Sequence, residues 1–190
     1  MQQFSDIEMN KALSFLLAVS MAFAVQAQNT VSVRIIPELS VLSKAGTTTL
    51  SIAYETDTAT LPIAYQMDII LPEGIVPAGA ENDARYAVSL DNTDGVYPVT
   101  FPGVNTPVHQ ITCSWQADKR VFRILCFSMS NVPFTRSTGK LLKIRLKPES
   151  DNLAQGSEAI IRNATFVMPD MKKCIAPETK ITIQLSEEDS

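Results

Sequence analysis

We first consider nucleophilic catalysis. This 190-residue chain contains one histidine, the residue type that most often acts as general base, and several hydroxyl and thiol side chains, which are the usual nucleophiles. A general base must lie within hydrogen-bond reach of its nucleophile. If His109 and Cys113 lie on one strand, their four-residue spacing corresponds to about 13 Å, which is too far for contact. Ser128 falls opposite His109 on the next expected strand. We interpret that pair as a structural hydrogen bond at the rim of a core.

Acidic side chains are the second group with catalytic potential. Glycoside hydrolysis requires two carboxylates that face each other across a cleft. Asp68 falls on an expected strand and Glu73, Asp91 and Asp94 fall in expected loops, so the sequence brings no two of them together. These acids lack the loop spacing of an EF-hand, and one histidine with three dispersed cysteines does not form a zinc motif. We therefore expect no catalytic residues, no metal, no cofactor and no enzymatic activity.

The charge balance argues against a nucleic-acid partner. The chain has 16 Lys and Arg against 20 Asp and Glu, which gives a net charge of −4. Neutralising a phosphate backbone requires a basic surplus. We therefore expect a different class of partner.

Segments rich in β-branched or aromatic residues, bounded by Pro, Gly, Asn or Asp, predict about nine strands. They cover 31–36, 47–55, 63–71, 85–90, 107–116, 121–130, 140–147, 158–168 and 179–185. Short strands with frequent turns and no helical crossovers indicate an all-β fold. The expected architecture is an antiparallel two-sheet sandwich of the jelly-roll kind.

A four-residue loop at 117–120 sets the register of the hairpin around it. Because side chains alternate along a strand, one face of this hairpin is apolar and should face the core. Its pairs are Trp115–Phe122, Cys113–Ile124, Ile111–Cys126 and His109–Ser128. The opposite face carries Ser114–Arg123, Thr112–Leu125 and Gln110–Phe127.

Leu125 and Phe127 are apolar side chains on the expected outer face. Either a loop or a neighbouring strand end covers them, or they form an exposed patch that receives a partner, since such patches mark contact sites. In the second interpretation, the partner-binding residues are Leu125 and Phe127 with Gln110, Thr112 and Arg123 around them.

Glycan binding uses outward aromatic faces with polar groups nearby. The single tryptophan, Trp115, falls on the apolar side of its strand, which favours core packing. Tyr86 and Tyr97 lie in or beside a polar connection, and they are the candidates for a glycan site borne by loops.

The three cysteines allow at most one intramolecular disulfide. In the expected register, Cys113 and Cys126 are diagonal neighbours at about 7–8 Å, beyond the usual reach of a disulfide. We expect both to be buried thiols and Cys174 to be the more exposed one.

The N-terminal stretch "MNKALSFLLAVSMAFAVQAQ" is typical of a secretory signal that ends at residue 27. Its apolar run of about 13 residues is shorter than the roughly 20 that span a membrane, so we favour removal over retention as an anchor. Asp6 and Glu8 are unusual before such a run, which indicates that translation starts at Met9. The expected organisation is a signal at 1–27, one β-sandwich domain at 28–185 and an acidic tail at 186–190.

Three stretches carry a family resemblance: "YQMDIILPEGI" at 65–75, "WQADKRVFRILCFSMSNVPFTRSTGKLLKIRLK" at 115–147 and "IIRNATFVM" at 160–168. They resemble cohesin-like β-sandwich domains of secreted Bacteroidetes proteins. The resemblance implies a jelly roll related to cohesins and to some carbohydrate-binding modules. Cohesins hold dockerin modules on one flat sheet face.

These observations predict an exported, non-catalytic binding or adhesion module. Its partner would be a protein or a polysaccharide at the cell envelope, bound through a sheet face or through end loops. A carbohydrate-binding module and a structural subunit of a cell-surface assembly are the alternatives. The sequence leaves open whether the mature chain stays in the periplasm, on the cell surface or outside the cell.

Overall fold

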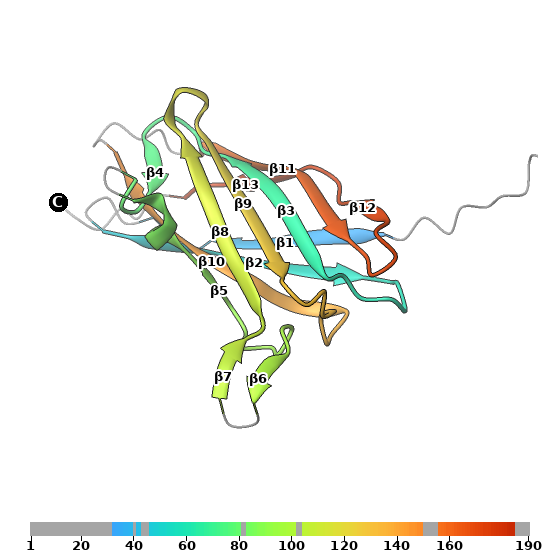
Figure 1. Cartoon of the computed structure of the whole chain (residues 1–190). Helices are drawn as coiled ribbons and strands as arrows, with labels where there is room; N and C mark the ends of the chain where they lie inside the picture. Colours follow the sequence, from blue (N-terminus) through green and yellow to red (C-terminus); the bar gives the residue numbers. More distant parts are fainter. Residues whose placement is uncertain are drawn as a thin grey trace, which may run out of the picture. The chain divides into compact units, whose positions relative to one another are not determined.

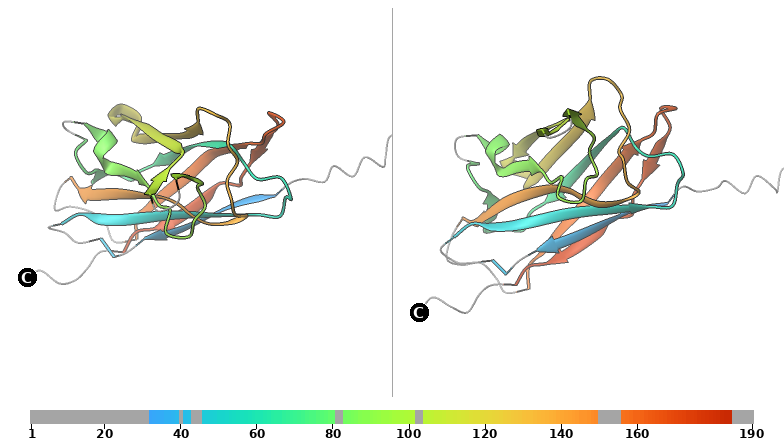
Figure 2. Two further views of the ribbon diagram at one scale, coloured as in Figure 1. Left: turned by 60° about the horizontal axis from the view of Figure 1, so that its bottom comes forward. Right: turned by 90° about the horizontal axis from the view of Figure 1, so that it is seen from below.

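The computed structural model describes residues 32–39, 41–42, 46–80, 83–101, 104–149 and 156–184. The expected signal at 1–27 and the acidic tail at 186–190 lie outside these residues. Two antiparallel sheets face each other as layers and enclose one hydrophobic core (Figures 1 and 2). The expected two-sheet sandwich is therefore confirmed.

The first sheet has five strands in the order β1-β2-β10-β4, with β5 also paired to β10. Their bounds are β1 Val33–Leu39, β2 Thr48–Thr56, β10 Thr138–Pro148, β4 Ile75–Pro77 and β5 Val88–Leu90. Side chains along β2 alternate between buried positions and partly buried or exposed ones, as expected where one face of a strand packs on a core.

The second sheet has six strands in the order β12-β11-β3-β9-β8, with β13 also paired to β11. Their bounds are β12 Lys173–Ile175, β11 Glu158–Val167, β3 Ala64–Ile70, β9 Val121–Ser128, β8 His109–Gln116 and β13 Thr179–Thr182. A separate hairpin of β6 (Val99–Phe101) and β7 (Val104–Pro107) extends from one end of the sandwich (Figure 1).

All nine expected strands have a counterpart, but one expectation is wrong in part. The first half of the strand expected at 85–90 is a 3₁₀ helix, Ala84–Ala87, which is capped by the side chain of Asp83. Four short strands, β4, β6, β7 and β12, were not expected. Each has only three or four residues, which is too short for an alternating pattern to stand out.

The β8–β9 hairpin has the register that the four-residue loop predicts. Trp115 pairs with Phe122, Cys113 with Ile124, Ile111 with Cys126 and His109 with Ser128. Phe122, Ile124 and Cys126 are fully buried, and Trp115 is half-buried against the core. The outer pairs, Ser114–Arg123, Thr112–Leu125 and Gln110–Phe127, are confirmed as well.

Aromatic rings form the centre of the core and join the two sheets. Tyr54 of the first sheet stacks on Phe166 of the second, with ring centroids 5.7 Å apart. The hydroxyls of Tyr65 and Tyr97 lie 3.1 Å apart, and that of Tyr97 donates to the Leu141 carbonyl at 2.8 Å. Burial raises the pKa of both tyrosines well above the usual range, so these hydroxyls stay neutral.

Arg120 ties the tip of the β8–β9 hairpin to the connection between β3 and β4. Its Nε donates to the carbonyls of Leu71 at 3.3 Å and Pro72 at 3.0 Å, and its guanidinium also donates to the Ile75 carbonyl. Its Nη1 lies 3.2 Å from the Glu149 carboxylate. One side chain thus holds three backbone carbonyls and one acid, which fixes where β8 and β9 reverse.

We expect Arg120→Ala to lower the free energy of unfolding by about 2–4 kcal/mol, because several hydrogen bonds from a charged donor are lost together. Arg120 has a φ of 53°, which a glycine adopts without strain. Arg120→Gly is therefore the matched control, and it should be destabilised by less than Arg120→Ala. Urea unfolding followed by circular dichroism measures both variants. An alanine variant as stable as the wild type would show that the side-chain contacts contribute nothing.

Candidate functional site

The outer face of the six-stranded sheet is the candidate site. Leu125 lies in a row across this sheet, with Thr112 of β8 on one side and Gln66 of β3 on the other. Beyond Gln66, the row continues through Thr165 of β11 to Ile175 of β12. Polar residues therefore surround Leu125, as the sequence predicted. The Leu125 side chain is 40% exposed.

A shallow hollow of about 290 Å³ lies beside Leu125 on this face. Leu125, Val167 and Ile175 are apolar residues of its lining, and Gln66, Thr165 and Lys173 are polar ones. Ile175 is 73% exposed. The sequence analysis missed Ile175 because β12 has only three residues; the alternation of Lys173, Cys174 and Ile175 is the only local signal for that strand.

Phe127 lies in the next row, between Gln110 of β8 and Ala64 of β3. Phe127 is half-buried, whereas Gln110 is exposed. The two apolar residues that the sequence singled out thus differ. Leu125 is exposed at the rim of the hollow, and Phe127 is partly covered.

A buried carboxylate holds Arg123 in place on the same face. The two oxygens of Asp68 accept from Nε and Nη2 of Arg123 at 2.7 and 2.9 Å, and Asn163 donates to Asp68 at 3.0 Å. Asn163 adopts a φ of 54° where the pairing of β11 with β3 is interrupted. These hydrogen bonds, led by the one from Arg123, lower the pKa of Asp68 against the opposing effect of burial.

Three exposed basic side chains lie on the outer face, and one of them, Lys173, lines the hollow. The Arg123 side chain is 55% exposed, while the Asp68 side chain beneath it is only 6% exposed. Arg162, opposite Asp68 on β11, and Lys173, in the lining of the hollow, are both exposed. These basic side chains contrast with the net charge of −4 on the whole chain.

The expected hydrogen bond between His109 and Ser128 is wrong, although the two residues do face each other. The Nε2 atom of His109 lies 3.2 Å from the Ile63 carbonyl oxygen. The Ser128 hydroxyl accepts from the backbone N–H groups of Ser130 and Val132 at 3.3 and 3.2 Å. Both side chains therefore form hydrogen bonds with backbone groups instead of with each other, and His109 is not positioned to activate Ser128.

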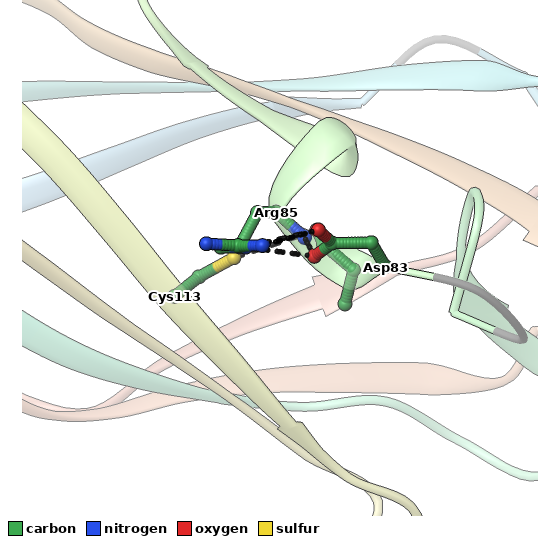
Figure 3. Close-up of polar contacts among 4 residues, drawn as sticks. Asp83, Arg85 and Cys113 are labelled. Carbon is green, nitrogen blue, oxygen red and sulfur yellow. Dashed lines mark hydrogen bonds and ion pairs between the residues drawn. The ribbon is translucent and has the colours of Figure 1, made fainter.

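Cys113 lies beside the 3₁₀ helix and contacts its backbone (Figure 3). Its Sγ donates to the Ala84 carbonyl at 3.4 Å, and Arg85 forms an ion pair with Asp83 at 2.7 Å next to it. Burial raises the pKa of Cys113 to about 11, with a smaller contribution from Asp83. The thiol is therefore protonated at neutral pH and is a poor nucleophile. It is half-buried rather than buried as expected, whereas Cys126 is buried.

Cys174 is half-buried in β12. All three cysteines are free thiols. Cys113 and Cys174 are both of intermediate exposure, so the expectation that Cys174 is the more exposed one stays a prediction.

The two tyrosines expected to form a glycan platform have different environments. Tyr86 is 74% exposed, but Tyr97 is 2% exposed and its hydroxyl is satisfied inside the core. Burial therefore removes Tyr97 from any glycan-binding surface. The sequence placed Tyr97 near a polar loop but could not show that its ring points inward.

The other acids also have structural roles. Asp91 is buried; it accepts from the Thr93 hydroxyl at 2.7 Å and lies 3.2 Å from Lys143 Nζ. Asp94 accepts from the backbone N–H of Lys140 at 2.9 Å. Within the described residues, no group of three or more His, Cys, Asp or Glu side chains is arranged to hold a metal ion. The described ranges also contain no helix with the length and hydropathy of a membrane span.

The fold is that of cohesin modules. A cohesin module from a family 33 glycoside hydrolase of Clostridium perfringens superposes with a TM-score of 0.59 at 10% identity, covering 84% of this chain and 100% of the module. A cohesin–dockerin complex from Clostridium thermocellum matches with a TM-score of 0.54 at 10% identity, covering 80% and 99%. A type II cohesin from Bacteroides cellulosolvens matches with a TM-score of 0.52 at 16% identity, covering 82% and 99%. No family model and no curated protein matches the sequence.

We expect Asp68→Asn to lower the free energy of unfolding by about 1–2 kcal/mol at pH 7, because charge-assisted hydrogen bonds are lost. The loss is no larger because Arg123 is exposed and solvent weakens its ion pair with Asp68. The folded pKa of Asp68 lies below its unfolded value of about 3.9. This contribution is therefore complete above about pH 4 and is lost as the pH falls through the folded value. Denaturant unfolding of both proteins from pH 7 to pH 2 should show their stabilities converge in acid. A difference that is constant with pH would contradict this role for the carboxylate.

Proposed function

We propose that this protein is a non-catalytic binding module that holds a protein partner against the outer face of its six-stranded sheet. The observation that carries the proposal is the exposed Leu125 beside a hollow lined by Val167 and Ile175. Apolar groups clustered within a polar surround on a soluble protein mark contact sites. Energetically dominant contacts concentrate in such desolvated centres, with polar residues at the rim.

The polar frame of this face is held rigid, which favours recognition. Asp68 and Asn163 fix Arg123, so little side-chain entropy is lost when Arg123 contacts a partner. Gln110 and Thr112 are exposed on the neighbouring strand and offer further hydrogen-bonding groups.

The charges indicate the chemistry of the partner. Arg123, Arg162 and Lys173 are exposed basic side chains on the outer face, and Lys173 lines the apolar hollow. A partner segment with an apolar anchor and flanking acidic side chains is therefore complementary to this face.

The fold supports this proposal by analogy. The Clostridium thermocellum structure is a complex of a cohesin with a dockerin. A shared fold at about 10% identity does not show that two proteins bind the same partner. We therefore define the partner by the chemistry of the outer face. An adhesive or structural role at the cell surface is consistent with the same proposal.

We also propose that the protein is exported, with its site of action in the periplasm, on the cell surface or outside the cell. The expected signal at 1–27 supports this compartment. The intact mass of protein purified from its native source should correspond to a chain that begins at Gln28. A mass that retains the first 27 residues would contradict removal of the signal.

The direct test of the binding face is capture from the envelope fraction of the source organism with Leu125→Asp. A buried charge at the centre of an apolar contact should weaken retention by about tenfold or more. Stability should change by no more than about 0.5 kcal/mol, because Leu125 is exposed at the surface. Retained proteins are identified by mass spectrometry, and their affinity is measured by surface plasmon resonance with each purified partner.

Ile36→Asp is the matched control. Ile36 is also 40% exposed and also lies on a strand, but it belongs to β1 of the other sheet. It should leave capture unchanged. A partner lost equally from both variants, or from neither, would place the binding site away from the outer face.

A further inference from the structure

The geometry points to a second binding site, for a neutral sugar residue, in the hollow beside Trp115. This hollow of about 520 Å³ lies at the edge of the sandwich, where strands of both sheets contribute to it. Trp115 comes from the end of β8, Val76 from β4, and Lys147 and Pro148 from β10. Its volume is within the range of about 300–1,000 Å³ that is usual for small-ligand pockets.

Trp115 supplies the aromatic surface that sugar binding requires. It lies on the core-facing side of β8, yet it is only half-buried because β8 is the edge strand of its sheet. Its ring packs edge-on to Phe122 at 6.5 Å. Arg120 lies over the ring at 5.8 Å but does not line the hollow, whereas Trp115 does.

Arg120 also positions Glu149, the carboxylate that lines the hollow together with Trp115. It holds the Glu149 carboxylate at 3.2 Å, and Glu149 lines the hollow with a side chain that is 54% exposed. The three backbone carbonyls bound by Arg120 keep this arrangement in place. Aromatic ring and carboxylate are therefore positioned before a ligand arrives, which reduces the entropic cost of binding.

The lining selects the class of ligand. The C–H face of a sugar ring packs on an aromatic side chain, and its hydroxyls donate to a carboxylate such as Glu149. The walls at Ala80 and Ala117 are small and leave room for a ring. The two charged side chains of the lining, Lys147 and Glu149, have opposite signs and give the hollow no net charge, so a neutral sugar fits it best.

This inference does not depend on the proposed protein-binding face. Trp115 lies on the side of the β8–β9 hairpin opposite to Leu125, since residues of opposite parity point to opposite faces of a strand. The two sites can therefore be tested separately with single substitutions.

The experiment uses the single tryptophan as its own reporter. Glycogen, mixed-linkage β-glucan, arabinoxylan and mannan are titrated against the mature chain while tryptophan emission is recorded. Retardation in native gels that contain each polymer gives an independent measure of binding. We expect at least one polymer to shift the emission and to retard the protein, and Trp115→Ala to weaken retardation by about tenfold or more.

Ala117→Arg is the second variant, because Ala117 is exposed and a larger side chain there fills the hollow without disturbing the core. It should also abolish retardation and should retain the wild-type circular dichroism spectrum. Tyr86→Ala and Leu125→Asp should bind as the wild type does. No retardation by any of the four polymers would overturn the inference. Retardation that survives Ala117→Arg, or that is lost in Tyr86→Ala, would overturn it as well.

Discussion

The register of β9 between β8 and β3 is the constraint on which the rest of the structure depends. On one side of β9, Phe122, Ile124 and Cys126 are fully buried. On the other side, Arg123 and Leu125 are exposed. Because the side-chain period of a strand is two, a slip of one residue would place Arg123 in the core and Phe122 in solvent. The packing of the core and the composition of the outer face are therefore specified together.

Polar contacts at the hairpin tip and between the sheets hold that register. At the tip, Arg120 binds carbonyls of the connection that follows β3, so β9 and β3 cannot slide past each other without breaking several hydrogen bonds. In the core, the Tyr97 hydroxyl links Tyr65 of one sheet to the Leu141 carbonyl of the other. Buried hydroxyls require such partners, and a satisfied polar network favours one arrangement of the sheets over others.

The parts of this fold that were predictable from the sequence are those set by local spacing. The β8–β9 register followed from a four-residue loop, and the outward position of Leu125 followed from that register. The contribution of Ile175 was not predictable, because it depends on the pairing of β12 with β11. The burial of Asp68 beneath Arg123 and Asn163 depends in the same way on strands distant in the chain. Tyr97 was misjudged because a polar neighbourhood in sequence does not reveal which way a ring points.

The β8–β9 hairpin serves both candidate sites because its two faces meet different surroundings. Its outer face is continuous with those of β3 and β11 and carries the hollow beside Leu125. On its inner face, Trp115 is half-buried and lines a hollow to which strands of both sheets contribute. Arg120 braces the hairpin at that edge, and Asp68 braces Arg123 on the outer face. Since these braces involve different atoms and opposite faces, the composition of either site can change while the register that supports both is kept.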